Sequence, residues 1–351
     1  MHRNTFLVPA ALVLSATVLT ACGGGGGGGT TSAQSNSLTF VSYGSAFQEN
    51  QKKAWQAPYT AATGTTFRND GPTDDAKTKT MVEANKVSWD VVDSGAAFAA
   101  QNCGKYLEKL DLSQLDTSKF PAGTVTDCGV PAYFYGLHFL YNTKKYGTNP
   151  PTTIADFFDT AKFPGQRMLP PEVAAGILED ALLADGVPAD KLYPLDVDRA
   201  LKKLDAIKAS ATLAKTYGQM QQAMVDNQVD MVLTVTARAT SSLNAGATFK
   251  PVWDKTILTW DSLVIPKGTP HKDAAMKFIA FTAKPEQSAK FTELANVLPS
   301  NSDAKPTLTA AQQQLNPNLD DRKSGTILSD VKWWSENLDA VTKKYTAWQA
   351  G

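Results

Sequence analysis

The chain has 351 residues, enough for about two domains of roughly 150 residues each, and its 34 basic residues balance 34 acidic ones. This neutrality argues against a nucleic-acid partner, because binding to a phosphate backbone normally requires a basic surface. A hydrophobic content of 42% with 9% aromatic residues is typical of a globular protein and excludes a disordered chain.

The first residues have the order of a secretory signal, with a charged start, an apolar middle and small residues before a cleavage site. Arg3 is the only permanent charge before an apolar run over 6–19, which is too short to span a bilayer as a stable helix. We therefore predict a signal peptide over 1–21. Its removal takes away Arg3 and leaves 33 basic against 34 acidic residues, so the mature body is almost neutral.

The predicted cleavage site, Leu19-Thr20-Ala21-Cys22, resembles the lipobox of bacterial lipoproteins, which are cleaved before the Cys and diacylated on its thiol. The resemblance implies a lipidated Cys22; the alternative is an ordinary signal with a chance Cys. A lipid chain contributes on the order of 0.8 kcal/mol per buried methylene, so an acylated Cys22 would hold the protein at a membrane surface without a transmembrane helix. The expected membrane contact is through this lipid anchor only. Residues 22–37, with seven glycines after Cys22, are predicted to be a flexible tether. The predicted location is the periplasm or the cell surface.

The body of the chain opens with alternating strand and helix patterns. We expect a strand at 38–41, a helix at 48–63 ended by Gly64, a helix at 73–86 and a buried strand at 89–95. Such alternation favours an α/β fold with a mainly parallel sheet, whose ligand sites lie at the carboxyl ends of strands. Tyr43 and Ser94 both fall at such ends.

Two cysteines remain in the exported body, Cys103 and Cys128. Their even number and an oxidising compartment favour a disulfide, and two free buried thiols are the alternative. Neither their spacing nor their neighbours indicate a metal site.

Two long extended segments, at 129–142 and 256–266, each separate groups of helices and are predicted to cross between two domains. The elements expected between and after them are helices at 153–158, 172–184, 196–209 and 218–226, a strand at 230–235, and helices at 238–244, 272–282, 285–294 and 333–348.

Several stretches in this order are similar to the extracellular solute-binding proteins of bacterial ABC importers, specifically the spermidine/putrescine-binding group and its relatives for small amino compounds. They are Trp89-Asp90-Val91-Val92-Asp93-Ser94, Val130-Pro131-Ala132-Tyr133-Phe134-Tyr135-Gly136, Gln228-Val229-Asp230-Met231, and Trp260-Asp261-Ser262-Leu263-Val264-Ile265-Pro266 followed by Ala274-Ala275-Met276-Lys277-Phe278-Ile279. The similarity runs over about 38–348.

The resemblance implies a type II periplasmic-binding-protein fold, in which two α/β lobes with mixed sheets and flanking helices close on a ligand in the cleft between them. One lobe is expected at 38–136 plus 262–300, and the other at 137–261 plus 301–351. The implied protein is a monomer that delivers a small amine or amino acid to ABC permease subunits. It performs no catalysis and needs no cofactor or metal.

Three residues match cleft positions of the family. Asp261 matches the carboxylate that meets a ligand ammonium, although a strand-end Asp can instead bond its own loop. Tyr43 matches the first aromatic position, and aromatic faces suit alkyl chains and ammonium groups. Ser94 matches a cleft hydroxyl. Tyr135 and Trp260 are further candidates, with a core role as the alternative, and Glu172 lies near the family's carboxylates for a terminal amine.

Arg238 departs from the polyamine pattern. The family commonly has a Trp followed by Asn and Gly near this position, whereas here Val235-Thr236-Ala237 precede Arg238. A guanidinium repels a diamine but pairs well with a carboxylate, and relatives that bind γ-aminobutyrate-like ω-amino acids combine such an Arg with the Asp 23 positions later, here Asp261. The alternative is that Arg238 braces a helix at the surface. The expected ligand is therefore a polyamine or an ω-amino acid.

A secreted hydrolase and a purely structural lipoprotein are the alternative functions. Only His138 and His271 remain after signal removal, and neither lies in a recognisable catalytic motif. His138 is expected to be packed within an aromatic strand, and His271 to be solvated at a helix start.

Overall fold

The computed structural model describes residues 36–319 and 321–351, apart from the side chain of Ser45. The predicted signal peptide, Cys22 and nearly all of the predicted tether lie outside this range. Among the described residues, no helix combines the length and the apolar character needed to cross a membrane.

One mixed sheet of 11 strands organises the described residues, with the order β2-β1-β3-β9-β4-β7-β5-β6 and three further strands paired to its centre. The strands are β1 (Ser37–Val41), β2 (Thr66–Asp70), β3 (Val91–Gly95), β4 (Val130–Asn142), β5 (Arg167–Leu169), β6 (Ala211–Leu213), β7 (Met231–Val235), β8 (Phe249–Pro251), β9 (Thr256–Val264), β10 (Leu298–Pro299) and β11 (Thr326–Leu328). The outer strands run parallel to one another, but β9 is antiparallel to both β3 and β4, so the expectation of a mainly parallel sheet is wrong at its centre.

Helices flank this sheet. They are α1 (Ser45–Gln51), α2 (Ala57–Thr63), α3 (Asp75–Glu83), α4 (Ala96–Gln101), α5 (Thr143–Tyr146), α6 (Ile154–Phe158), α7 (Ile177–Ala184), α8 (Val197–Asp205), α9 (Tyr217–Val225), α10 (Thr236–Asn244), α11 (Lys272–Thr282), α12 (Pro285–Ala295), α13 (Ala310–Gln314) and α14 (Val331–Ala350). Short 3₁₀ turns connect several of them, and a π-helical segment at Lys52–Gln56 joins α1 to α2.

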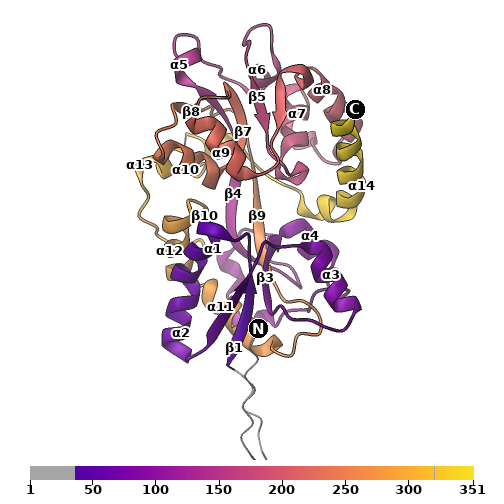
Figure 1. The fold of residues 1–351 in the computed structure, drawn as a ribbon, viewed down its shortest axis with the longest axis vertical. Helices are drawn as coiled ribbons and strands as arrows, with labels where there is room; N and C mark the ends of the chain where they lie inside the picture. Colours follow the sequence, from indigo (N-terminus) through magenta and orange to yellow (C-terminus); the bar gives the residue numbers. More distant parts are fainter. Residues whose placement is uncertain (1–35, 320) are drawn as a thin grey trace, which may run out of the picture. The chain divides into compact units, whose positions relative to one another are not determined.

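The hydrophobic core separates into two main clusters on either side of β4 and β9. The first contains Phe40, Trp55 and Phe278, and belongs to a first group of elements comprising β1–β3, α1–α4, α11 and α12. The second contains Phe157, Leu182 and Trp334, and belongs to a second group comprising β5–β7, α6–α10 and α14. The strands β4 and β9 pass from one group to the other (Figure 1), as the two long extended segments predicted.

Helix boundaries follow local capping chemistry. Asp74 begins α3 by accepting a hydrogen bond from the backbone N–H of Lys77, and Gly64 ends α2 in the left-handed conformation. The predicted helix at 172–184 is wrong in its first turn, because Gly176 has a φ of 113° and a Cβ there would lie 2.8 Å from Cβ of Ile257. The α-helix therefore begins at Ile177 and leaves Glu172 in the preceding loop.

A disulfide joins Cys103, which follows α4, to Cys128, which precedes β4.

His138 and His271 differ in their surroundings. His138 is buried, and its Nε2 lies 2.9 Å from Oγ1 of Thr236. The expectation that His271 is solvated is wrong, because its Nδ1 lies 3.0 Å from a carboxylate oxygen of Asp90 and the side chain is mostly covered.

A bulge in β4 sets which side chains face the site. Val130 lies opposite Leu263 and Pro131 opposite Ser262, but the next residue of β9, Asp261, faces Tyr133 rather than Ala132. Such a bulge adds one residue to a strand and turns the following side chains to the other face. Tyr133 and Tyr135 therefore lie on the same face of the sheet as Asp261.

Candidate functional site

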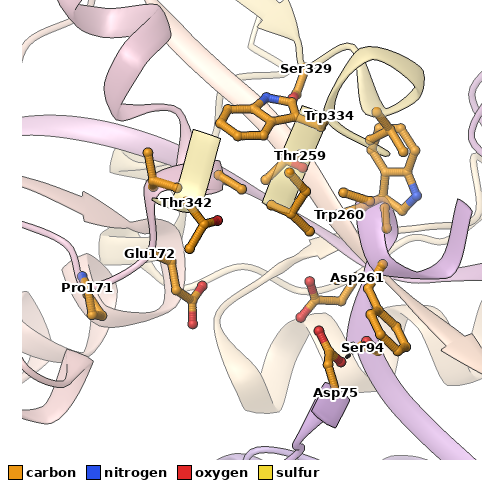
Figure 2. Close-up of a pocket in the computed structure, with 18 of the residues that line it drawn as sticks. Asp75, Ser94, Pro171, Glu172, Thr259, Trp260, Asp261, Ser329, Trp334 and Thr342 are labelled. Carbon is orange, nitrogen blue, oxygen red and sulfur yellow. Dashed lines mark hydrogen bonds between the residues drawn. The ribbon is translucent and has the colours of Figure 1, made fainter. Parts of the chain in front are cut away.

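Two adjoining cavities lie where the first and second groups of elements meet. The larger has a volume of about 380 Å³, the smaller about 100 Å³, and both are lined by Tyr43, Tyr135, Glu172 and Asp261. Figure 2 shows Asp75, Glu172 and Asp261 directing their carboxylates toward one space although they come from different elements. We call the combined space the cleft.

Asp261 on β9 is the most buried carboxylate of the cleft lining, with 4% of its surface exposed. The hydroxyl of Tyr133 donates to its Oδ2 at 2.6 Å, and that of Tyr135 donates to its Oδ1 at 3.4 Å. Burial raises the pKa of Asp261, and hydrogen bonds from Tyr133, Tyr43 and Tyr135 oppose this rise. No cation among the described residues pairs with this carboxylate, so its charge is compensated only by hydroxyl groups.

Aromatic rings enclose the same point. Tyr43, in the loop after β1, packs edge-on against Phe47 at 6.2 Å between ring centroids, and Phe47 packs against Tyr133 at 5.3 Å. Tyr43 keeps 39% of its surface exposed and faces the cleft. Tyrosine rings around a carboxylate suit an alkyl ammonium group, because the ring faces attract the cation and the carboxylate neutralises it.

Arg238 enters the smaller cavity from the first turn of α10, in the second group of elements. Burial lowers its pKa, and the one electrostatic partner of its guanidinium within the described structure is the Tyr217 hydroxyl. Glu172 also faces this cavity and accepts a hydrogen bond from the Tyr217 hydroxyl at 3.3 Å. The guanidinium has five donors in a fixed fork, and no carboxylate of the described residues receives them.

Two further carboxylates line the larger cavity. Asp75, in the first turn of α3, accepts a hydrogen bond from the Ser94 hydroxyl at 3.0 Å, and burial raises its pKa to about 6. Burial by the cleft walls likewise raises the pKa of Glu172 to about 7, although its side chain remains exposed to cleft water, which limits the effect. Both groups are therefore partly protonated near neutral pH.

The raised pKa of Asp75 predicts a pH-dependent stability. The folded chain holds this proton more tightly than the unfolded chain, so the stabilisation is complete below about pH 4 and is lost as the pH rises through about 6. From about pH 4 to about pH 7 we expect the unaltered protein to lose about 1 kcal/mol of unfolding free energy relative to Asp75→Asn, because cleft water reduces the full effect. Denaturant unfolding of both proteins across this range measures it, and parallel profiles would contradict the prediction.

Trp260 and α14 form the rest of the wall. Trp260 is 2% exposed, packs against Phe134 at 5.5 Å between ring centroids, and its Nε1 has no partner among the described residues. Trp334 on α14 also lines the larger cavity, while its Nε1 donates to Glu179 at 2.8 Å. The indole of Trp260 thus belongs to both the core and the cleft.

All the residues that the sequence singled out for ligand contact line the cleft, namely Tyr43, Ser94, Tyr135, Glu172, Arg238, Trp260 and Asp261. Sequence reasoning missed Asp75, Tyr133 and Tyr217. Asp75 falls within the predicted helix at 73–86, where no ligand role was expected, and Tyr133 is brought to Asp261 by a bulge that no sequence pattern indicated. In the described ranges, no group of three or more His, Cys, Asp or Glu side chains is arranged to hold a metal ion.

Comparisons with known proteins agree with this architecture. Residues 54–319 match the sequence profile of a family described as bacterial extracellular solute-binding protein. A curated relative, the gamma-aminobutyric acid-binding protein of Pseudomonas aeruginosa, is 31% identical over 326 residues, which cover 91% of this chain and 92% of the relative.

Solved structures are similar over nearly the same length. A structure of a GABA receptor superposes with a TM-score of 0.83 at 39% identity, covering 89% of this chain and 97% of that chain. PBP AgtB from A. tumefaciens R10, in complex with agropinic acid, gives a TM-score of 0.79 at 33% identity and covers 90% and 99% of the two chains. PBP MotA from A. tumefaciens B6, in complex with glucopine, gives 0.81 at 31% identity and covers 89% and 99%.

Proposed function

The chain belongs to the bacterial extracellular solute-binding proteins, and from that premise we propose that it captures a small ω-amino acid of the γ-aminobutyrate type for import by an ABC transporter. Asp261 would receive the ligand ammonium, enclosed by the rings of Tyr43, Tyr133 and Tyr135. Arg238 would receive the ligand carboxylate. The other predicted residues would complete the walls of the cleft.

The observation that carries this proposal is the pair of uncompensated charges around the smaller cavity. Within the part of the chain that the structure describes, Asp261 has no cationic partner and Arg238 no anionic one, although both line a space of about 100 Å³. Asp261 is buried and Arg238 is partly buried, and such charges normally carry a partner, because desolvating an isolated charge is costly. A ligand with an ammonium at one end and a carboxylate at the other supplies both partners at once.

The printed names of the relatives support the same ligand class. The P. aeruginosa relative is a gamma-aminobutyric acid-binding protein, and one solved relative is a GABA receptor. The relatives in complex with agropinic acid and glucopine indicate that larger ligands also suit this architecture.

A polyamine is the second candidate. Asp75 and Glu172 supply carboxylates that a second ammonium group would need, and together with Asp261 they outnumber the one arginine of the cleft lining. Against it, the Arg238 guanidinium, which no described carboxylate pairs, lines the same cavity as Asp261 and would repel the second cation. We therefore favour the ω-amino acid.

Ligand capture would close the cleft. We propose that the first and second groups of elements are the cores of two lobes, at 38–136 plus 262–300 and at 137–261 plus 301–351, hinged at β4 and β9. Asp261 lies on the hinge strand β9 and Arg238 on α10, so a ligand held by both residues would bridge hinge and lobe. A ligand stabilises closure only through contacts that are better in the closed form.

The proposed setting is outside the cytoplasm. We propose that the mature protein is a monomer, tethered to a membrane through a lipid on Cys22, and that it presents its ligand to ABC permease subunits. Labelling with a radioactive or clickable fatty acid in a bacterial host tests the anchor. Loss of the label in Cys22→Ser is the expected result.

A ligand panel tests the proposed function. γ-Aminobutyrate should raise the melting temperature of the purified protein by several degrees at a concentration about 100 times Kd, since such an excess stabilises the folded state by about 2.7 kcal/mol. Putrescine and spermidine should give no shift, and α-amino acids smaller ones, because their two charges lie too close together to reach both Asp261 and Arg238. Differential scanning fluorimetry measures the melting temperature, and titration calorimetry measures Kd. A shift with diamines alone would reject the ω-amino acid, and no shift with any amino compound would reject the class.

A further inference from the structure

A single hydroxyl group stands between two buried carboxylates beneath the cleft. The Oη of Tyr133 lies 2.6 Å from Oδ2 of Asp261, and 3.2 and 3.4 Å from the two carboxylate oxygens of Asp93 on β3. The register of β3, β9 and β4 brings these side chains to one face of the sheet, since Asp93 lies opposite Leu263, two residues from Asp261. Asp93 does not line the cleft and has no part in the proposed ligand contacts.

The number of protons decides how this arrangement is bonded. A tyrosine hydroxyl carries one proton, so it can donate to only one of two carboxylates. Hydrogen bonds of the O–H···O⁻ type are short, about 2.5–2.7 Å, and the distance to Asp261 falls in that range whereas the distances to Asp93 do not. The Tyr133 proton therefore points at Asp261. The contact with Asp93 is attractive only if Asp93 brings a proton of its own and donates it to Tyr133.

The surroundings of Asp93 favour that extra proton. Its side chain has 0% of its surface exposed and is faced by Ser42 from the loop after β1, Gln51 from α1, Tyr133 from β4 and Asp261 from β9. No cation among the described residues faces it. Burial, followed by the neighbouring Asp261, raises the pKa of Asp93 well above its usual range, and the hydrogen bonds from Gln51 and Ser42 oppose this rise.

Asp261 differs from Asp93 in its access to the cleft. It borders the cleft, where water or a ligand cation can reach it, and it receives hydrogen bonds from tyrosine hydroxyls. Of two close buried carboxylates, the one with better access to a cation and to charge-assisted donors keeps the negative charge. The proton of the pair therefore resides on Asp93.

We propose that Asp93 is a neutral carboxylic acid that donates to Tyr133 and thereby holds Tyr133 as a one-way donor to Asp261, so that the ammonium end of the cleft carries one negative charge instead of two. Asp93 is then a positioning residue that acts through Tyr133. Because the ammonium end of the cleft then carries a single negative charge, on Asp261, it accepts one ammonium group and leaves no second buried anion unpaired. This assignment rests on the proposed function only for the identity of the ligand.

Infrared difference spectroscopy tests the protonation of Asp93 without any ligand. At mildly alkaline pH, where Asp75 and Glu172 are ionised, the unaltered protein should show a protonated-carboxyl C=O band that is absent from Asp93→Asn. Tyr133→Phe should move the same band to higher frequency, because the acid loses its hydrogen-bond acceptor. If Asp93→Asn does not fold, the position of the acid band in Tyr133→Phe alone decides whether a protonated Asp93 donates to Tyr133. An unchanged acid band in both variants overturns the proposal.

Binding supplies a second readout. Asparagine keeps the acceptor and donor of a neutral acid, so Asp93→Asn should weaken γ-aminobutyrate binding at least about tenfold less than Asp261→Asn does. Equal losses in the two variants would mean that Asp93 carries a charge that the ligand senses, and would overturn the proposal. If no amino compound binds the unaltered protein, the proposed function fails and the infrared spectra still decide the state of Asp93.

Discussion

Replacing Asp261 with asparagine should weaken γ-aminobutyrate binding by about 30-fold or more while leaving the fold intact. Removing one partner of a buried charge pair costs about 2–5 kcal/mol, because the other charge then stays desolvated and unpaired. Asp261 is 4% exposed, and its only compensation in the described structure comes from tyrosine hydroxyls. In Asp261→Asn the ligand ammonium would meet an amide in place of a carboxylate. Titration calorimetry at neutral pH measures the loss.

Asp198→Asn is the matched control for that experiment. Asp198 lies in the first turn of α8 and forms an exposed ion pair with Lys344 at 2.8 Å, whereas Asp261 is buried. Exposed pairs contribute about 0–1 kcal/mol to stability, and Asp198 lines neither cavity of the cleft. The affinity of the Asp198→Asn protein for γ-aminobutyrate should therefore stay within about twofold of that of the unaltered protein. Equal affinity of Asp261→Asn and the unaltered protein would remove Asp261 from the site.

Replacing Arg238 with glutamine should change which class of amine binds. Loss of the guanidinium removes the proposed partner of the ligand carboxylate, so γ-aminobutyrate affinity should fall by about 30-fold or more. The same change removes a positive charge from a cavity that also contains Asp261 and Glu172, so putrescine affinity should rise. Opposite movements of the two affinities cannot come from a general loss of fold, which would weaken both.

Arg199→Gln serves as the control for Arg238. Arg199 lies on α8, pairs with Asp185 at 2.7 Å and is exposed, so both affinities should be unaffected. If Arg238→Gln weakens neither ligand, Arg238 braces α10 and does not meet a carboxylate. If it weakens γ-aminobutyrate without improving diamines, Arg238 still holds the carboxylate, and the remaining acids do not form a diamine site.

The two variants together test the proposed bridge between the hinge strand β9 and the second lobe. Asp261 belongs to β9, a strand shared by both halves of the sheet, and Arg238 belongs to the second group of elements. A ligand that touches only one of them has no reason to favour closure. We therefore expect small-angle scattering to show compaction by γ-aminobutyrate in the unaltered protein and not in Arg238→Gln.

The expected α/β fold of a periplasmic binding protein is confirmed by the mixed sheet and its flanking helices, which superpose on a solved relative with a TM-score of 0.83. Periodicity was sufficient for the long helices α11 and α12, because their apolar residues repeat at the spacing of a helix, and β4 was recognised from its long, nearly continuous apolar and aromatic run. It missed β2, whose residues 66–70 are mostly polar and exposed at a sheet edge. It also extended a helix through Gly176, where contact with Ile257 forces a left-handed turn.

Sequence by itself determined the family, the order of the elements and the main charged groups of the cleft, because family motifs and hydrophobic spacing are local properties of the chain. Only the tertiary structure decided how those groups are partnered. The bulge that brings Tyr133 to Asp261, the register that brings Asp93 behind it and the unpaired state of Arg238 depend on contacts between residues far apart in sequence. A hydrogen bond is decided by distance and a charge by its surroundings, and both arise only when separate strands and helices meet.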